Sequence, residues 1–191
     1  MMDPLEQLAQ WVDAAGGADS LEAVAMCLAT ASVSAQPSAR IVLLRGIDAR
    51  GLRFFTSYQS RKARELAENP RAAAVLHWPG LHRQVRVEGD VTKLSDDESD
   101  EYFEARPRGH RIAAWASEQS EPLESYGLLE ERFAHFEQRF EGDDVPRPHS
   151  WGGYLLAPSR IEFWQGRPNR MHERVAYIKS DNAWSTIQLQ P

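Results

Sequence analysis

The chain has 191 residues, 42% of them hydrophobic and 26% charged, which is the ordinary composition of one globular domain. Its formal net charge of -6 excludes a general nucleic-acid binder, because affinity for phosphate backbones needs a basic surface. No apolar run approaches the ~20 residues that cross a membrane, and no basic stretch followed by an apolar one marks a secretory signal.

The first half of the chain alternates helical and extended patterns. Apolar residues recur at helical spacing over residues 4–15, and a Gly-Gly pair then ends the helix. A second helix is expected over residues 60–68, before an Asn-Pro pair. Apolar and β-branched runs between turn residues predict strands over residues 23–33, 40–47, 52–56, 72–78 and 84–92.

The second half begins with helices and ends with strands. Ser95 and Glu98 have the spacing of a capping box, which opens a helix to about residue 105. Further helices are expected over residues 112–117 and 122–140. The last one carries an apolar stripe that should form core or a subunit contact: Leu129, Phe133, Phe136 and Phe140. After a Pro-rich link, strands are predicted over residues 151–156, 159–164, 174–178 and 184–189.

These elements predict a single domain over residues 1–191, mainly β with helices. We expect an antiparallel β-barrel with an N-terminal helix and with helices inserted at about residues 95–140. No repeat, low-complexity tract or linker divides the chain. A chain of this size that must also bury aromatic stripes on its helices is a good candidate for a homodimer.

A C-terminal run carries the most distinctive chemical pattern. Arg170, His172 and Arg174 recur at a spacing of two, shortly after Trp164. In an extended segment such side chains point the same way, so two guanidinium groups would flank an imidazole. Arg binds phosphate or stacks on rings, and His exchanges protons near neutral pH. This face suits a planar, anionic, heteroaromatic ligand; an edge strand with solvated charges is the alternative.

Two further groups of cations also suggest anion binding. Arg61, Lys62 and Arg64 stand in the first turn of the second predicted helix, where cations oppose the helix dipole. A bound anion would remove this conflict, because free N–H groups and cations together hold phosphate; a solvated turn is the alternative. Arg40 and Arg45 bracket an apolar strand, and burying them is costly unless a ligand anion or an acidic residue meets them.

A last cluster lies near the end of the third helix. Tyr102 and Arg106 are four residues apart and so share one helix face. Two separate clusters of phosphate-type chemistry indicate one diphosphate ligand or two monophosphate ligands. The sequence has no Gly-rich nucleotide loop and no serine-nucleophile elbow. Its six His lack metal-ligand spacing, so no metal is expected. The single Cys27 fits a reducing, cytoplasmic compartment.

Several runs of the chain, in order, match the motifs of one known family. They are residues 40–45, 60–64, 83–85, 102–107, 115–120 and 161–174. Together they resemble the pyridoxine/pyridoxamine 5'-phosphate oxidase family, and the likeness covers nearly the whole chain. The resemblance implies a split antiparallel β-barrel that binds FMN, and a homodimer with two flavin sites at the subunit interface.

The resemblance also implies the residues of the cofactor site. Arg40 and Lys62 would hold the FMN phosphate, and Gln84 would meet the ring system. Some of the set would come from the partner subunit, namely Gln119, Ser120, Trp164 and Arg174. The whole implied set is Arg40, Ile41, Val42, Leu43, Leu44, Arg45, Phe55, Thr56, Arg61, Lys62, Gln84, Gln119, Ser120, Trp164 and Arg174.

The implied substrate is a phosphorylated B6 vitamer. Its phosphate would be held by Tyr102 and Arg106 with help from Arg45. Arg170 and His172, the implied catalytic residues, would lie over the pyridine ring. The whole implied substrate-binding set is Arg45, Tyr102, Arg106, His110, Arg170, Met171 and His172.

The implied reaction converts pyridoxine or pyridoxamine 5'-phosphate to pyridoxal 5'-phosphate. A hydride would pass from the substrate C4' carbon to flavin N5, and O2 would reoxidise the flavin and leave as hydrogen peroxide. One alternative is a related FMN-dependent oxidase of another reduced heteroaromatic ring, of the phenazine type. It is motivated by Arg45 in place of the usual Lys, by His110 in place of a small hydroxyl residue, and by an expected lack of the N-terminal extension. A non-catalytic flavin-binding protein is the other alternative.

Overall fold

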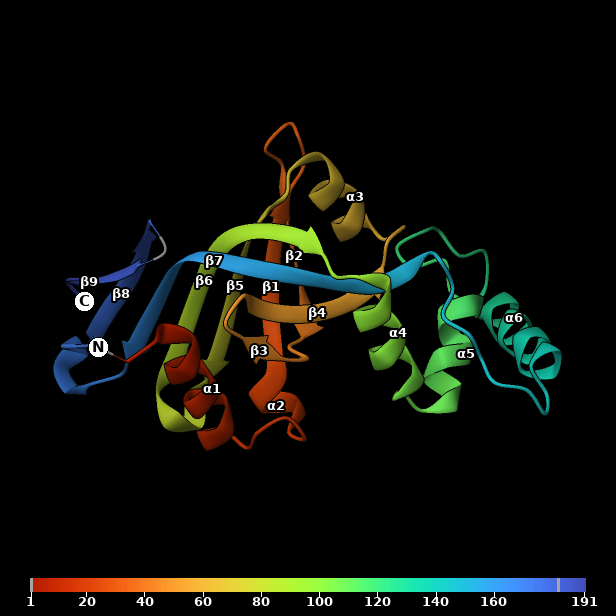
Figure 1. Ribbon diagram of the computed structural model, residues 1–191, viewed down its shortest axis with the longest axis horizontal. Coiled ribbons are helices and arrows are strands. Elements are labelled where there is room, and N and C mark those ends of the chain that lie inside the picture. The colour runs from red at the N-terminus through yellow and green to blue at the C-terminus, as the bar shows by residue number, and fades with distance from the viewer. Residues whose placement is uncertain (1, 182) are drawn as a thin grey trace.

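The computed structural model describes residues 2–181 and 183–191, and one antiparallel sheet is its framework (Figure 1). Its strands run in the order β2-β1-β5-β6-β7-β4-β3, with β8 paired to β7 and β9 paired to β8. Their bounds are β1 (Ala25–Ala31), β2 (Pro37–Leu43), β3 (Ile47–Asp48), β4 (Gly51–Ser57), β5 (Arg71–Trp78), β6 (Arg83–Lys93), β7 (Trp151–Gln165), β8 (Glu173–Ser180) and β9 (Ala183–Gln188).

The two ends of this strand order are joined by one short stretch of chain. β2 pairs with β1, and just beyond Leu43 the chain turns to lie along β4. There the Arg45 N–H donates to the Arg53 carbonyl (2.8 Å), and the Arg53 N–H donates to the Gly46 carbonyl (2.9 Å). The stretch after β2 is therefore hydrogen-bonded to β4, which brings the two ends of the strand order together and closes the barrel. The predicted fold class, an antiparallel barrel with peripheral helices, is confirmed.

The helices lie around the barrel and beyond it. In Figure 1, α5 and α6 occupy one end of the long axis, while β8, β9 and both termini occupy the other. Within the described residues, no helix is long and apolar enough to span a bilayer. The bounds are α1 (Pro4–Ala14), α2 (Leu21–Val24), α3 (Arg61–Glu68), α4 (Asp96–Glu104), α5 (Arg108–Ala116) and α6 (Tyr126–Arg139), with single 3-10 turns η1 (Pro79–Leu81) and η2 (Pro168–Arg170).

Side-chain caps set the starts of four helices, α1, α2, α4 and α6. The predicted capping box at α4 is confirmed, because Ser95 Oγ accepts from the Glu98 N–H and the Glu98 carboxylate accepts from the Ser95 N–H. At α2, Ser20 Oγ accepts from the Ala23 N–H. This cap favours a helical turn, so the strand predicted from residue 23 begins at Ala25 instead.

The barrel encloses the main hydrophobic core, and a smaller one lies between α5 and α6. Fully buried side chains point inward from most barrel strands, namely Met26, Leu28, Leu52, Phe54, Leu76, Val85, Val87, Leu156 and Ile161. The smaller core consists of Ile112, Phe140 and Val145, with Trp115, Phe133 and Phe136 packed against it. The aromatic part of the predicted apolar stripe is thus core.

The two strands predicted over residues 151–156 and 159–164 are wrong, because β7 runs through both without a break. The pairing of β6 with β7 shifts register between Glu88 and Gly89. This irregularity lets Pro158 enter the strand, since proline is tolerated at bulges. A Cβ at Gly89 would lie 2.0 Å from the Ala157 carbonyl oxygen, so only glycine fits at this close approach.

Leu156 gives a direct test of the barrel core. It is fully buried between Leu52 of β4 and Val91 of β6. We expect Leu156→Ala to lower the free energy of unfolding by about 2–5 kcal/mol, because it leaves a cavity. Urea unfolding would measure this. The matched control is Leu21→Ala, at a side chain 66% exposed, which should change stability by less than about 0.5 kcal/mol. Equal effects would contradict the placement of β7.

Candidate functional site

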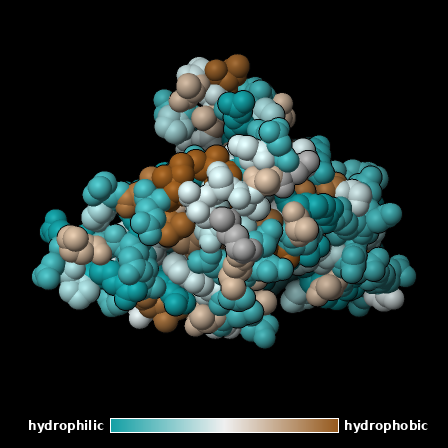
Figure 2. All heavy atoms as spheres, turned by 60° about the vertical axis from the view of Figure 1, so that its left-hand side comes forward, coloured by the Kyte–Doolittle hydropathy of each residue, from teal (hydrophilic) through white to brown (hydrophobic). Residues whose placement is uncertain are grey.

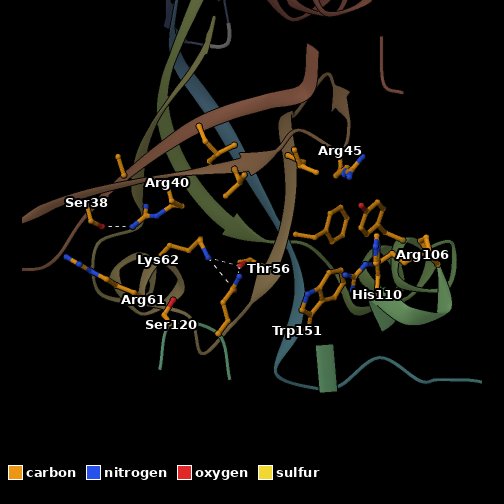
Figure 3. A pocket seen from close by; sticks show the side chains of 18 of the residues that line it. Ser38, Arg40, Arg45, Thr56, Arg61, Lys62, Arg106, His110, Ser120 and Trp151 are labelled. Atoms are coloured by element: carbon orange, nitrogen blue, oxygen red, sulfur yellow. Dashed lines mark hydrogen bonds between the residues drawn. The ribbon is translucent and has the colours of Figure 1, made fainter. Parts of the chain in front are cut away.

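A cavity of about 970 Å³ opens between the barrel, α3 and the α4–α5 segment. Figure 3 shows cationic side chains at two ends of it, here called the α3 end and the α4 end. The α3 end is lined by Ser38, Arg40, Thr56, Arg61, Lys62, Gln119 and Ser120. The α4 end is lined by Arg45, Phe55, Tyr102, Ala105, Arg106, Pro107, His110 and Trp151. Residues 39 and 41–43 of β2 also line the cavity.

Strand alternation and a buried carboxylate place the first two cations of the α3 end. Arg40 pairs with the buried Leu28 across β1 and β2, so its side chain faces inward. Its guanidinium binds the carboxylate of Glu65 (3.3 Å), which also accepts from Ser38 Oγ (2.6 Å) and from Arg61 Nε (2.9 Å). Sequence reasoning left open whether a ligand anion or an acidic residue meets Arg40, and an acidic residue does.

Glu65 stays ionised in this position. Burial acts to raise its pKa, but hydrogen bonds from Ser38, Thr30 and Arg61 outweigh burial and lower the pKa to about 2. One carboxylate thus pairs with Arg40 and Arg61, and Lys62 of the same end is not paired with it. The cations outnumber it at the α3 end, which leaves positive charge for a ligand anion.

Lys62 is the most deeply buried cation of the cavity, with 6% of the residue exposed. Its ammonium donates to Thr56 Oγ1 (3.0 Å), Ser60 Oγ (3.3 Å) and Gln119 Oε1 (3.4 Å). None of these partners carries a negative charge. Burial, and then the charge of Arg40, lower the pKa of Lys62 to about 8.

The N-terminus of α3 adds further donors. Ser60 is the N-cap residue, yet its hydroxyl donates to the Ser57 carbonyl (2.8 Å) and makes no side-chain cap. The first N–H groups of α3 therefore have no side-chain acceptor, and helix N-termini of this kind favour anions. Backbone donors, two arginines and a buried lysine together fit a phosphate group.

The α4 end combines a half-buried cation with a stack of aromatic rings. Tyr102 stacks on Phe55 at 3.8 Å between centroids, and the Arg106 guanidinium lies 4.5 Å over the ring of Trp151. The Nη1 atom of Arg106 is buried without a hydrogen-bond partner. Burial lowers the pKa of Arg106; Tyr102 opposes this shift, and the charge of Arg45 adds to it. A cation with a buried and unused donor fits a second anion.

Gln119 and Ser120 lie in the cavity of their own chain, so the expectation that the partner subunit supplies them is wrong. Gln119 Oε1 accepts from Thr56 Oγ1 (2.8 Å) and from the Ser57 N–H (3.3 Å). The segment after α5 folds back over the start of α3, where Arg64 also pairs with Glu121. This contact spans about sixty residues of sequence, so no local pattern could reveal it.

The other predicted site residues gather elsewhere, on what we call the distal surface: Gln84, Trp164, Arg170, Met171, His172 and Arg174. Gln84 and Arg174 flank Trp164 on neighbouring strands. Glu162, only 2% exposed, accepts from Arg174 Nη2 (2.7 Å) and Nε (2.9 Å). None of these residues lines the cavity, so the described chain does not bring the two groups together.

The extended segment expected to align Arg170, His172 and Arg174 is wrong. Asn169 and Arg170 adopt left-handed backbone conformations (φ 57° and 61°) in the turn η2, and β8 begins only at Glu173. His172 is positioned by this turn instead. Its Nδ1 accepts from the Arg167 N–H (3.1 Å), and its ring lies 4.7 Å from Trp164.

Three other placements differ from the sequence-based set. Leu44, expected beside the flavin, is buried in the core instead and borders a smaller cavity. Ser38 and Trp151 line the main cavity but were not expected there. Ser38 could have been found, because it is two residues before Arg40 on the same strand face. The place of Trp151 in the cavity could not be predicted from the sequence, since it depends on contacts with α4.

The depressed pKa of Lys62 predicts a pH-dependent stability. Between about pH 8 and its ordinary pKa of 10.5, the unfolded chain binds more protons than the folded one. The free energy of unfolding should therefore gain up to about 1.4 kcal/mol per pH unit from this group. Lys62→Met abolishes this gain. The free energy of unfolding of the wild type should therefore rise relative to that of the variant as pH rises from 8 to 10. Urea unfolding of the ligand-free proteins across this pH range measures this. A difference in the free energy of unfolding that stays constant with pH would contradict it.

The chain is similar to known proteins along nearly its whole length. Residues 19–140 match the family model of pyridoxamine 5'-phosphate oxidase, and residues 151–191 match that of the pyridoxine 5'-phosphate oxidase C-terminal dimerisation region. The pyridoxine/pyridoxamine 5'-phosphate oxidase of Rubrobacter xylanophilus is 52% identical, with 99% of this chain and 87% of that protein covered. The protein of the same name from Ralstonia pickettii is 54% identical, and the match covers 98% of this chain and 89% of that protein.

Solved structures of similar proteins share the fold of this chain. PhzG from Burkholderia lata, crystallised with tetrahydrophenazine-1-carboxylic acid, superposes with a TM-score of 0.93 at 34% sequence identity. The match covers 99% of this chain and 93% of the PhzG chain. A pyridoxamine 5'-phosphate oxidase-related, FMN-binding protein from Nostoc punctiforme has the same fold, with a TM-score of 0.77 at 19% identity and full coverage of both chains. From the matched family models and the relatives above, the chain belongs to the pyridoxine/pyridoxamine 5'-phosphate oxidase family.

Proposed function

We propose that this protein is an FMN-dependent oxidase that converts pyridoxine or pyridoxamine 5'-phosphate to pyridoxal 5'-phosphate. The observation that carries the proposal is one cavity with two separate cationic ends, in a chain of this family. Two ends suit two monophosphates, one on the cofactor and one on the substrate. The cytoplasmic location expected from the single Cys27 is part of the proposal.

The α3 end fits the FMN phosphate. Arg40, Arg61 and Lys62 supply charge, while Thr56 and the N-terminus of α3 supply neutral donors. Ile41, Val42 and Leu43 form an apolar wall between the two ends, against which the flavin ring would lie. When bound, FMN supplies the two-electron acceptor that O2 then reoxidises, with release of hydrogen peroxide.

The α4 end fits the substrate phosphate. Arg106 offers a buried, unused N–H, Arg45 adds charge, and Tyr102 and His110 line the same end. Anchoring the phosphate there would direct the pyridine ring toward the apolar wall, where the C4' carbon gives up a hydride and its substituent a proton. The alcohol then becomes the aldehyde directly, whereas the amine also takes up water and releases ammonia.

The distal surface would complete the site of a second copy. Residues 151–191 match a dimerisation region, and they include Trp164, Arg170, His172 and Arg174. In a homodimer with FMN at the interface, Trp164 and Arg174 would reach the partner's cofactor. Arg170 and His172 would cover the partner's substrate, where His172 could exchange a proton with the ring hydroxyl.

The outer face of the sheet supports this homodimer. Figure 2 shows hydrophobic residues gathered near the middle of one view and surrounded by hydrophilic ones. A groove of about 710 Å³ on the sheet is lined by small and apolar residues such as Ala25, Cys27 and Val75, and by Ile41, which is 63% exposed. An apolar surface of this kind favours burial against another protein surface.

A second candidate substrate is a reduced phenazine-type ring. PhzG, whose structure contains tetrahydrophenazine-1-carboxylic acid, superposes on nearly the whole chain, and Arg45 and Arg106 would bind a carboxylate as well as a phosphate. Arg45 and His110, the departures from the usual family pattern, also favour it. A non-catalytic flavin-binding protein would bind FMN without its reduction by any vitamer.

The proposed function is tested on the purified, FMN-loaded protein. We expect anaerobic addition of pyridoxamine 5'-phosphate to bleach the flavin absorption, and air to restore it with about one hydrogen peroxide per pyridoxal 5'-phosphate formed. Pyridoxine 5'-phosphate should act in the same way. An unbleached flavin with both vitamers would reject the proposal. Bleaching by tetrahydrophenazine-1-carboxylic acid alone would favour the second candidate.

Arg170 provides a test of the distal surface. Arg170→Ala should lower kcat/KM for pyridoxamine 5'-phosphate by about 10- to 100-fold, the scale of one charged hydrogen bond, while FMN remains bound. Arg167→Ala is the matched control, because Arg167 is an exposed neighbour paired with Glu173 (3.0 Å); it should stay within about twofold of the wild type. Normal turnover in Arg170→Ala would remove this residue from the site.

A further inference from the structure

Arg106 lacks the carboxylate partners of two other half-buried arginines, Arg40 and Arg147. Arg40 is paired with Glu65, and Arg147 binds Asp96 (2.7 Å) and Asp100 (2.5 Å). Within the described residues, no carboxylate lies at ion-pair distance from Arg106, and its Nη1 atom has no acceptor. Such a cation needs another favourable contact to offset its loss of hydration.

The ring of Trp151 provides that contact. The Arg106 guanidinium lies 4.5 Å from the centroid of Trp151 and 5.4 Å from that of Phe103. An aromatic face attracts the plane of a guanidinium through its quadrupole but accepts none of its in-plane N–H groups. A carboxylate partner would occupy those N–H groups and cancel the charge. The indole therefore holds the cation while leaving it free for a ligand anion.

Trp151 is itself fixed in position. Its ring lies nearly parallel to Tyr102 (8°) and Phe55 (14°), with centroids at 6.2 Å and 5.7 Å. Its backbone N–H donates to the Pro148 carbonyl (2.9 Å), and its backbone carbonyl accepts from Arg147 Nη1 (2.8 Å). The residue is 8% exposed. Contacts on both ring and backbone thus leave the indole little freedom to move.

We propose that Trp151 is a positioning residue of the oxidase: its indole face orients Arg106 and keeps its charge available for the phosphate of the substrate. The inference deepens the proposed function and rests on it. Trp151 acts through Arg106 and takes no part in the oxidation. Its loss should weaken binding of the phosphorylated substrate and leave both the chemical step and the FMN site intact.

The test compares two substitutions in the FMN-loaded protein. Trp151→Leu removes the aromatic face, and we expect KM for pyridoxamine 5'-phosphate to rise about tenfold, the scale of a desolvated cation–π contact. The values of kcat and of the FMN dissociation constant should stay within about twofold. Trp151→Phe keeps an aromatic face and should restore KM to within about threefold of the wild type.

Trp184→Leu is the matched control. Trp184 also lies near a cation, Lys179 (5.7 Å), but it stands in β9 and does not line the cavity; its loss should leave KM unchanged. An unchanged KM in Trp151→Leu would overturn the inference. An FMN dissociation constant that rises together with KM, or a Trp151→Phe variant as impaired as Trp151→Leu, would overturn it too, because either result indicates a general structural role.

Calorimetric titration with inorganic phosphate separates this inference from the proposed function. With FMN bound, only the α4 end remains for phosphate, so affinity should fall about tenfold in Trp151→Leu and recover in Trp151→Phe. This result is expected even if the wild type oxidises neither vitamer, an outcome that would reject the proposed function alone. Equal phosphate affinity in all three proteins would overturn the role of Trp151.

Discussion

The buried carboxylate of Glu65 is the interaction on which the cavity depends. It accepts hydrogen bonds from Thr30 of β1 and Ser38 of β2, and it pairs with Arg40 and with Arg61 of its own helix. Because both of its oxygens accept hydrogen bonds, the carboxylate remains charged although it is buried. Any shift of α3 away from the barrel would break the contacts of this carboxylate with Thr30, Ser38 and Arg40, which is costly for buried polar groups. One carboxylate thus joins helix and sheet and fixes the geometry of the cations around it.

The two ends of the cavity hold their cations in different ways, and the difference suits their proposed ligands. At the α3 end, Glu65 neutralises part of the charge, and uncapped N–H groups and the buried Lys62 complete a site that suits a permanently bound cofactor. At the α4 end, Arg106 rests on an aromatic ring and keeps its full charge. A substrate must bind and leave many times, so a cation without a competing carboxylate is useful there.

Local patterns predicted much of this molecule, and distant contacts account for the rest. The cluster of cations around Lys62 followed from their spacing in one helical turn, and the barrel followed from strand periodicity, because both depend on neighbouring residues. The position of Gln119 could not be predicted from local patterns, since its contact with Thr56 joins segments far apart in sequence. The left-handed turn at Arg170 could not be predicted either, because residues other than glycine rarely adopt that conformation. The family resemblance supplied the site set, but it placed Gln119 in the wrong subunit.

The unbroken course of β7 has a consequence for how the molecule assembles. The strand begins at Trp151 beside the cavity and ends just past Trp164 on the distal surface. At the rise of an extended chain, these two tryptophans are separated by roughly 40 Å. A strand of that length, paired with β6, β4 and β8, holds the distal residues of a chain away from the cavity of the same chain. In the proposed homodimer, each copy would therefore lend its distal residues to the other, and damage to one β7 strand would affect both sites of the pair.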